Sequence, residues 1–127
     1  IPIYNRSFFI DETLSSLLNQ TYTNIEIICV DDYSTDNSLE KLKAYALKDD
    51  RIKIVRHQKN LGPHSARQTG VSNALGDYIL FLDCDDALEI FACASLYDIL
   101  SKTDYDVLEF AYKHKNKKKI PHHKIIY

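Results

Sequence analysis

The chain has 127 residues, of which 45% are hydrophobic and 27% charged, and its formal net charge is −2. These values are ordinary for one globular domain, and the near-neutral charge gives no reason to expect a nucleic-acid partner. No apolar run approaches the roughly 18 residues of a transmembrane helix. The sequence contains no methionine, so we expect a fragment of a longer protein.

Strand and helix patterns alternate along the chain. Runs of β-branched and apolar residues predict strands, and apolar residues three or four positions apart predict helices. In chain order these are the end of a strand at 1–5, a helix from near Ser7 to Leu18, a strand at 24–30, a helix after the capping oxygens of 34–36, a strand at 51–55, a helix from 62 to 76, a strand at 77–82, a helix at 88–100 and a strand at 106–112. This alternation predicts an α/β fold with a mainly parallel sheet and helices on both faces.

Two of the expected strands run directly into acidic clusters. Residues 27–30 are followed by Asp31-Asp32, and residues 79–82 by Asp83-Cys84-Asp85-Asp86. Ligands of open parallel sheets bind beyond the carboxyl ends of the strands. We therefore expect both clusters to line one crevice, although about fifty residues of sequence separate them.

Carboxylates packed this closely repel one another, and a hard divalent cation with oxygen ligands relieves that repulsion. We therefore predict Mg²⁺ or Mn²⁺ at Asp83 and Asp85, with coordination positions left open for a substrate diphosphate. Asp86 is better explained as the cap of the following helix. The three cysteines and the pair His122-His123 lack the spacing of a zinc site, and the scattered thiols fit a reducing compartment.

Two further segments suit an anionic nucleotide. Residues 60–67 place Gly62, free backbone N–H groups and Arg67 around a helix start, where phosphate binds readily. Tyr4 follows the first strand and can present its ring to a base at the same sheet edge. The basic run 113–119 is interpreted as a solvated loop, with contact to an acidic acceptor or anionic lipid as the alternative.

Five segments in this order resemble the family 2 glycosyltransferases of GT-A fold. They are 2–5 (PIYN), 17–22 (LLNQTY), 30–36 (VDDYSTD), 60–67 (NLGPHSAR) and 76–86 (GDYILFLDCDD). The resemblance covers roughly residues 1–87. It implies a single GT-A (Rossmann-like) nucleotide-sugar-binding domain over 1–127, truncated relative to a complete inverting transferase.

The resemblance implies a base-binding role for Pro2, Tyr4 and Asn5, and a hydrogen bond from Asp32 to uracil. It implies that Arg67 lies at the diphosphate, with Asn60 and Gly62 in the loop beside it. Asp83-Cys84-Asp85 matches the DxD motif, in which Asp85 is the direct metal ligand and Asp83 lies near the ribose or the metal's waters. The expected donor is a nucleoside diphosphate sugar, usually a UDP-sugar.

The chain also departs from the family pattern. Tyr33 stands where glycine is usual, which we expect to narrow the base pocket. Residues 87–89 replace the usual aromatic residue and proline after the acidic motif. The family's general base lies well beyond that motif, so the catalytic residue is unknown and is expected outside this chain. Glu109 is a late carboxylate within an expected strand, and we do not assign it.

Two other interpretations stay open at this point. The first is a catalytically incompetent nucleotide-binding fragment or interaction module. The second is a phosphatase of the haloacid dehalogenase type, in which the two aspartates of 83–85 would be nucleophile and acid, although Ala87 stands where that family has threonine or valine.

For a transferase the acceptor would be a glycan or a lipid-linked glycan. The resemblance to builders of bacterial surface polysaccharide and lipopolysaccharide implies a cytoplasmic protein, with peripheral contact at the cytoplasmic face of the membrane.

Overall fold

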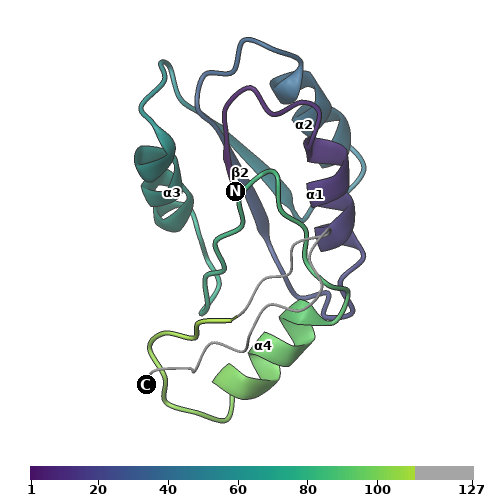
Figure 1. The fold of residues 1–127 in the computed structure, drawn as a ribbon, viewed down its shortest axis with the longest axis vertical. Helices are drawn as coiled ribbons and strands as arrows, with labels where there is room; N and C mark the ends of the chain where they lie inside the picture. Colours follow the sequence, from purple (N-terminus) through teal and green to yellow (C-terminus); the bar gives the residue numbers. More distant parts are fainter. Residues whose placement is uncertain (111–127) are drawn as a thin grey trace, which may run out of the picture. The chain divides into compact units, whose positions relative to one another are not determined.

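A computed structural model describes residues 1–110 (Figure 1), and the chain divides into two compact units, Ile1–Ala94 and Ser95–Tyr127. The first unit contains strands β1 (Pro2–Ile3), β2 (Ile27–Asp31) and β3 (Ile52–Arg56) and helices α1 (Ile10–Leu18), α2 (Ser38–Ala46) and α3 (Pro63–Ser72). Helix α4 (Ala92–Leu100) begins in the first unit and continues into the second. A single domain over the whole chain stays a prediction. The basic run 113–119 and His122-His123 lie outside the described residues.

The described sheet is parallel throughout, as the sequence predicts. Its strand order is β1-β2-β3, with Ile3 opposite Asp31 and Asp31 opposite Arg56. All three strands therefore end at the same edge of the sheet, which is where parallel sheets bind their ligands.

Helices cover both faces of this sheet: α3 lies on one side and α1 and α2 on the other (Figure 1). Ile27 and Cys29 of β2 join Leu14 of α1 and other buried residues in the main hydrophobic core. On the opposite face α3 approaches β2 closely, since a Cβ atom at Gly70 would lie 3.8 Å from Val30 Cγ2. Alternate side chains of β2 therefore pack on opposite faces of the sheet, one set in the main core and the other against α3.

Helix α1 begins three residues later than predicted, because side chains of the α2 start bind the preceding turn. The Arg6 N–H donates to Ser38 Oγ at 2.9 Å, and the Ser7 N–H donates to Asp36 Oδ2 at 3.1 Å. Asp36 Oδ1 also accepts the Ser38 N–H at 3.0 Å, so this side chain takes up the first N–H group of α2, although the N-cap position itself is Asn37. Burial raises the pKa of Asp36, but the hydrogen bonds from Ser38 and Ser7 outweigh it and lower the pKa to about 2.

The predicted strand at 77–82 is wrong, because this segment forms no ladder with the described sheet. Ile79 and Phe81 are 48% and 55% exposed, and Leu82 is buried in the core. An apolar run becomes a strand only where a neighbouring strand accepts its backbone hydrogen bonds. Residues 106–110 of the other expected strand also lack regular structure, and 111–112 lie outside the described residues.

Two helices are shorter than predicted because other contacts take up their backbone groups. Helix α3 ends at Ser72, and the N–H groups of Leu75 and Gly76 donate to Glu26 Oε1 at 2.6 and 2.9 Å. Helix α4 starts at Ala92 instead of 88, which leaves Asp86 too far away to cap it. Within the described part of the chain, no helix is both long and apolar enough to cross a membrane.

Candidate functional site

A cleft of about 330 Å³ opens at the carboxyl edge of β1 and β2. It is built by the ends of these two strands, the start of α3 and the acidic segment after residue 82. Its lining residues are Pro2, Ile3, Tyr4, Arg6, Asp32, Asn60, Gly62, Pro63, Ala66, Arg67, Asp83, Cys84 and Asp85. The structure therefore brings together the residues expected to bind the donor, with the exception of Asn5.

Asn5 does not line the cleft, because its side chain joins β1 to the loop after β2. Its Oδ1 accepts the backbone N–H groups of Thr35 at 2.8 Å and Asp36 at 3.3 Å, and its own N–H donates to Ser34 Oγ at 3.0 Å. The backbone φ of 52° at Asn5 lies in the left-handed region, which asparagine tolerates better than most residues. Asn5 thus holds the end of β1 against the loop that follows β2.

Asp32 is the carboxylate at the centre of the site, and it is only 2% exposed. Its Oδ1 accepts the Leu61 N–H at 2.8 Å and lies 2.7 Å from His57 Nδ1, and its Oδ2 accepts the Gly62 N–H at 2.7 Å. Burial raises the pKa of Asp32, but these three hydrogen bonds outweigh that effect and leave the pKa below its ordinary value. Asp32 is therefore ionised and fixes the loop before α3.

The same contacts correct one expectation about that loop. The N–H groups of Leu61 and Gly62 were expected to be free for a phosphate, but both are bound to Asp32. Gly62 has a φ of 86°, which glycine adopts readily, and the space around it is open. Pro63 then starts α3 at a position where its missing N–H costs nothing. The glycine is thus required by the turn itself.

His57 is a residue that sequence reasoning missed. Its Nδ1 contacts Asp32, and its Nε2 lies 2.9 Å from Thr69 Oγ1 on α3. The imidazole therefore connects the central carboxylate to the helix behind the cleft. A histidine just after a strand that ends beside the acidic pair was the available signal.

Asp31 and Tyr33 flank Asp32, but neither lines the cleft. Asp31 is fully buried, since successive side chains of a strand point to opposite sides. Its Oδ2 lies 3.1 Å from Arg56 Nε without the alignment of a hydrogen bond. Tyr33 has a φ of 67°, which explains why glycine suits this position, and its ring lies under the Arg56 guanidinium at 5.7 Å. The expected narrowing of the base pocket by Tyr33 is therefore wrong.

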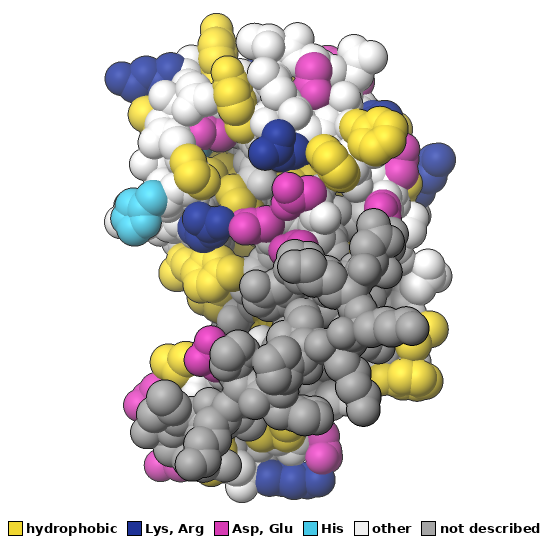
Figure 2. Space-filling view, in the orientation of Figure 1, with side chains coloured by type: hydrophobic (Ala, Val, Ile, Leu, Met, Phe, Trp, Pro, Cys, Tyr) yellow, Lys and Arg dark blue, Asp and Glu magenta, His cyan; other side chains and the backbone are white. Residues whose placement is uncertain are grey.

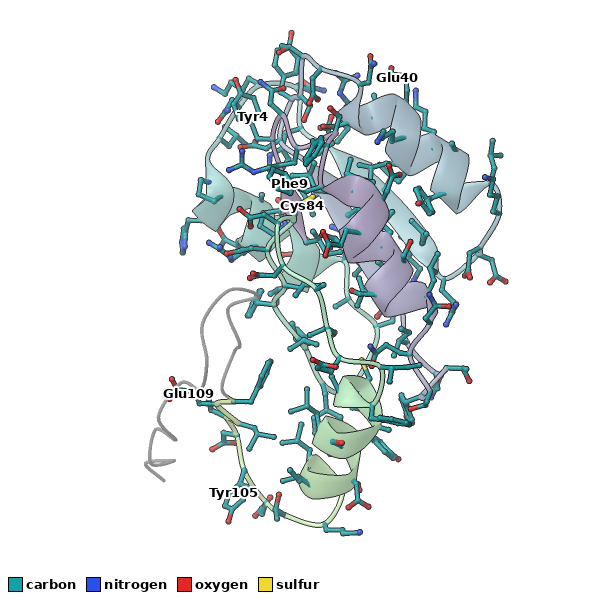
Figure 3. The ribbon with its side chains drawn as sticks, turned by 45° about the vertical axis from the view of Figure 1, so that its right-hand side comes forward. Tyr4, Phe9, Glu40, Cys84, Tyr105 and Glu109 are labelled. Carbon is teal, nitrogen blue, oxygen red and sulfur yellow. The ribbon has the colours of Figure 1, made fainter. Side chains whose placement is uncertain are left out.

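Exposed and buried side chains alternate along the acidic segment 83–85. Cys84 is buried in the core beside α1 (Figure 3), whereas Asp83 and Asp85 are exposed at the cleft. Arg67 Nη2 lies 2.6 Å from Asp83 Oδ1, which forms an ion pair across the cleft. Acidic and basic side chains lie side by side on this face of the molecule (Figure 2).

This donor set fits a hard cation that shares its ligands with a substrate. In the described part of the chain, no group of three or more His, Cys, Asp and Glu side chains could hold a metal by itself. Asp85 is an exposed carboxylate of the cleft, and Asp83 already has Arg67 as a partner. Mg²⁺ is commonly bound by one or two carboxylates together with substrate phosphates.

Arg6 is a second cation of the cleft, and sequence reasoning did not select it. It follows β1, is exposed and lines the same space as Arg67. Its backbone N–H is bound to Ser38 Oγ, which fixes where the side chain leaves the main chain. The available signal was its place one residue after the segment 2–5.

Comparisons with known proteins agree with this geometry. The sequence model of glycosyl transferase family 2 matches residues 1–125. The chain is 39% identical over 108 residues to glycosyltransferase GlyG of Streptococcus pneumoniae, which covers 85% of the chain and 36% of GlyG. The chain spans between 12% and 34% of other curated relatives. It is thus much shorter than the transferases that it matches.

Solved structures show the same relationship. TarS 1-349 of S. aureus in complex with UDP-GlcNAc matches with a TM-score of 0.86 and 31% identity, over 95% of this chain and 35% of TarS 1-349. The mannosyltransferase PcManGT of Pyrobaculum calidifontis, in complex with GDP-Man and Mn²⁺, matches with a TM-score of 0.64 and 26% identity, over 68% of this chain and 26% of that one. The chain belongs to glycosyl transferase family 2 and has the α/β GT-A fold. This membership excludes the phosphatase alternative.

Proposed function

We propose that this family 2 glycosyltransferase chain binds a UDP-sugar in the cleft, together with Mg²⁺ or Mn²⁺. The observation that carries the proposal is the meeting of Asp32, Arg67 and the segment 83–85 in one cleft. UDP and UDP-GlcNAc are bound by the structural relative TarS 1-349, which supports the choice of nucleotide. Mn²⁺ in the PcManGT complex supports the choice of cation.

The uracil would occupy the end of the cleft formed by Pro2, Tyr4 and Asp32. Asp32 Oδ2 accepts one hydrogen bond, from Gly62, and a carboxylate oxygen has two lone pairs. It can therefore accept a further hydrogen bond, such as one from the imide N–H of uracil. The exposed ring of Tyr4 offers an apolar face to the base.

The diphosphate would lie at the other end, beside Arg6, Arg67 and Asp85. Arginine binds phosphate oxygens in a bidentate manner, and the start of α3 adds the positive end of a helix dipole. Asp85 would hold the cation, which, when bound, offsets negative charge on the diphosphate. Asp83 would then lie near the ribose, and Arg67 would exchange part of its ion pair with Asp83 for contacts to the diphosphate.

For the complete transferase we propose in-line displacement at the anomeric carbon. Cationic side chains around the diphosphate stabilise the charge that builds on the leaving group. An acceptor hydroxyl attacks as a general base removes its proton. We assign that base to no described residue of the cleft, because Asp32 holds the loop before α3 and would bind the uracil, Asp83 is paired with Arg67, and Asp85 would hold the cation.

We propose a glycan or lipid-linked glycan as acceptor, and a cytoplasmic location with peripheral contact at the membrane. Three free cysteines fit a reducing compartment. The absence of an assigned base favours one further hypothesis, that this chain binds donor without transferring sugar. A transfer assay on this chain and on a longer relative would separate the two.

The first experiment is a calorimetric titration of UDP into the chain, with and without Mn²⁺. We expect binding that requires the metal and that disappears in Asp85→Ala. Asp50→Ala is the matched control, because it removes one exposed carboxylate in the turn between α2 and β3, away from the cleft. Equal UDP affinity in both variants, or no metal requirement, would contradict the proposal.

A further inference from the structure

A polar stripe on α1 and just beyond its end contacts the segment 84–93. Its members are Thr13 and Ser16, which lie three positions apart on one face of the helix, and Gln20, two residues after the helix ends. Thr13 and Gln20 are only 1% and 3% exposed, although both are polar. Buried polar side chains of this kind are held by hydrogen bonds.

Each member of the stripe binds the backbone of the segment 84–93. Ser16 Oγ accepts the Leu88 N–H at 3.1 Å. Gln20 donates its amide to the Glu89 carbonyl at 2.9 Å, and its Oε1 accepts the Cys93 N–H at 2.9 Å. The acidic segment has no strand partner in the described sheet, so these contacts replace the ladder that a strand would have.

Thr13 holds the part of this segment that contains Asp85. Its Oγ1 lies 2.9 Å from the Cys84 carbonyl oxygen and 2.9 Å from the Asp86 carbonyl oxygen. These two carbonyl groups flank Asp85 on either side, and the Asp86 N–H closes the turn onto the Asp83 carbonyl at 3.0 Å. The single proton of this buried hydroxyl can be donated to either carbonyl, so one side chain holds the backbone on both sides of Asp85, whose side chain lines the cleft.

We propose that Thr13 is a positioning residue of the donor site: its hydroxyl holds the 83–86 turn in the shape that presents Asp85 to a metal–diphosphate ligand. This inference rests on the proposed function for the identity of the ligand. The anchoring of the turn is a property of the free chain and can be tested without any ligand.

The test compares Thr13→Val, which keeps the shape of the side chain and removes the hydroxyl, with Thr13→Ser, which keeps the hydroxyl. Ile10→Val is the matched control, because it weakens the core on the same helix at a side chain that has no hydroxyl group to bind the acidic segment. Amide hydrogen exchange of the ligand-free chain is measured first. In Thr13→Val we expect exchange at Asp86 and Leu88 to accelerate by roughly three- to tenfold relative to Ile10→Val, the range of a net hydrogen bond. Thr13→Ser should behave as the wild type.

The second measurement is the affinity for UDP in the presence of Mn²⁺. We expect Thr13→Val to bind UDP roughly three- to tenfold more weakly than Ile10→Val at a temperature where both are folded. Thr13→Ser should restore most of the affinity, which a purely structural effect on the core would not reproduce.

The outcomes separate this inference from the proposed function. Failure of the wild type to bind UDP with Mn²⁺ overturns the donor-site proposal, and the exchange comparison then still decides whether Thr13 anchors the turn. Equal exchange at Asp86 and Leu88 in Thr13→Val and Ile10→Val overturns the role of Thr13. If Thr13→Val does not fold, Thr13→Ala takes its place, with faster exchange at Asp86 than in Ile10→Val as the expected result and equal exchange as the refuting one.

Discussion

Replacing Asp32 by asparagine should destabilise the fold as well as the donor site. The carboxylate is 2% exposed and takes part in three hydrogen bonds, with His57, Leu61 and Gly62. Asparagine keeps one acceptor oxygen and places an N–H₂ group where the other oxygen stood, facing a backbone N–H. The loss of one charge-assisted bond, plus an unsatisfied buried donor, gives an expected loss of about 2–4 kcal/mol in the free energy of unfolding.

Urea unfolding of the chain at pH 7, followed by circular dichroism, measures this quantity. Asp85→Asn is the control, because Asp85 is exposed and its substitution should leave the free energy of unfolding close to that of the wild type. A loss below about 1 kcal/mol in Asp32→Asn would refute the idea that Asp32 organises the loop before α3, since that is the size of one ordinary hydrogen bond.

Two further predictions concern other residues of the first unit. Asp36 has a folded pKa of about 2, below its unfolded value, so its contribution to stability is present above about pH 4 and is lost as the pH falls toward 2. At pH 7 the free energy of unfolding of Asp36→Asn should therefore be about 2 kcal/mol below that of the wild type, and its thermal midpoint should fall less between pH 4 and 2 than the midpoint of the wild type; parallel curves would argue against this cause. Arg6→Ala should weaken UDP binding by about tenfold and uridine binding much less, as measured by calorimetry, with Arg6→Lys intermediate; equal losses for both ligands would place Arg6 away from the diphosphate.

The sequence predicted the parallel sheet, and which residues meet in the cleft, better than the ends of the elements. Apolar periodicity located the three strands of the described sheet and helices α1 to α3, but not the irregular segment 77–82. The positions of Asp32, Arg67 and Asp85 followed from strand ends and the family pattern. What it did not predict depends on long-range partners. Glu26, about fifty residues earlier in the chain, binds the backbone N–H groups that follow α3. Side chains of the polar stripe bind the backbone after the acidic segment, which has no strand partner in the described sheet.

Local reasoning also treated neighbouring polar groups as equivalent. Asp31 and Asp32 are adjacent, but only Asp32 lines the cleft, because the strand turns the Asp31 side chain to the other side. The N–H groups of Leu61 and Gly62 look free in a glycine loop, and only the position of Asp32 shows that they are occupied.

The burial of Cys84 has a consequence for which metals the site can attract. Its thiol stands between two aspartates in sequence, but burial, with a smaller effect from Asp85, raises its pKa to about 11. At neutral pH only about one molecule in ten thousand would carry the thiolate that zinc, cadmium or mercury prefers. The Cys84 thiol is also only 4% exposed, so the exposed donors of the acidic segment at the cleft are the carboxylate oxygens of Asp83 and Asp85. A cation at the proposed site would therefore meet oxygen donors, which hard cations prefer.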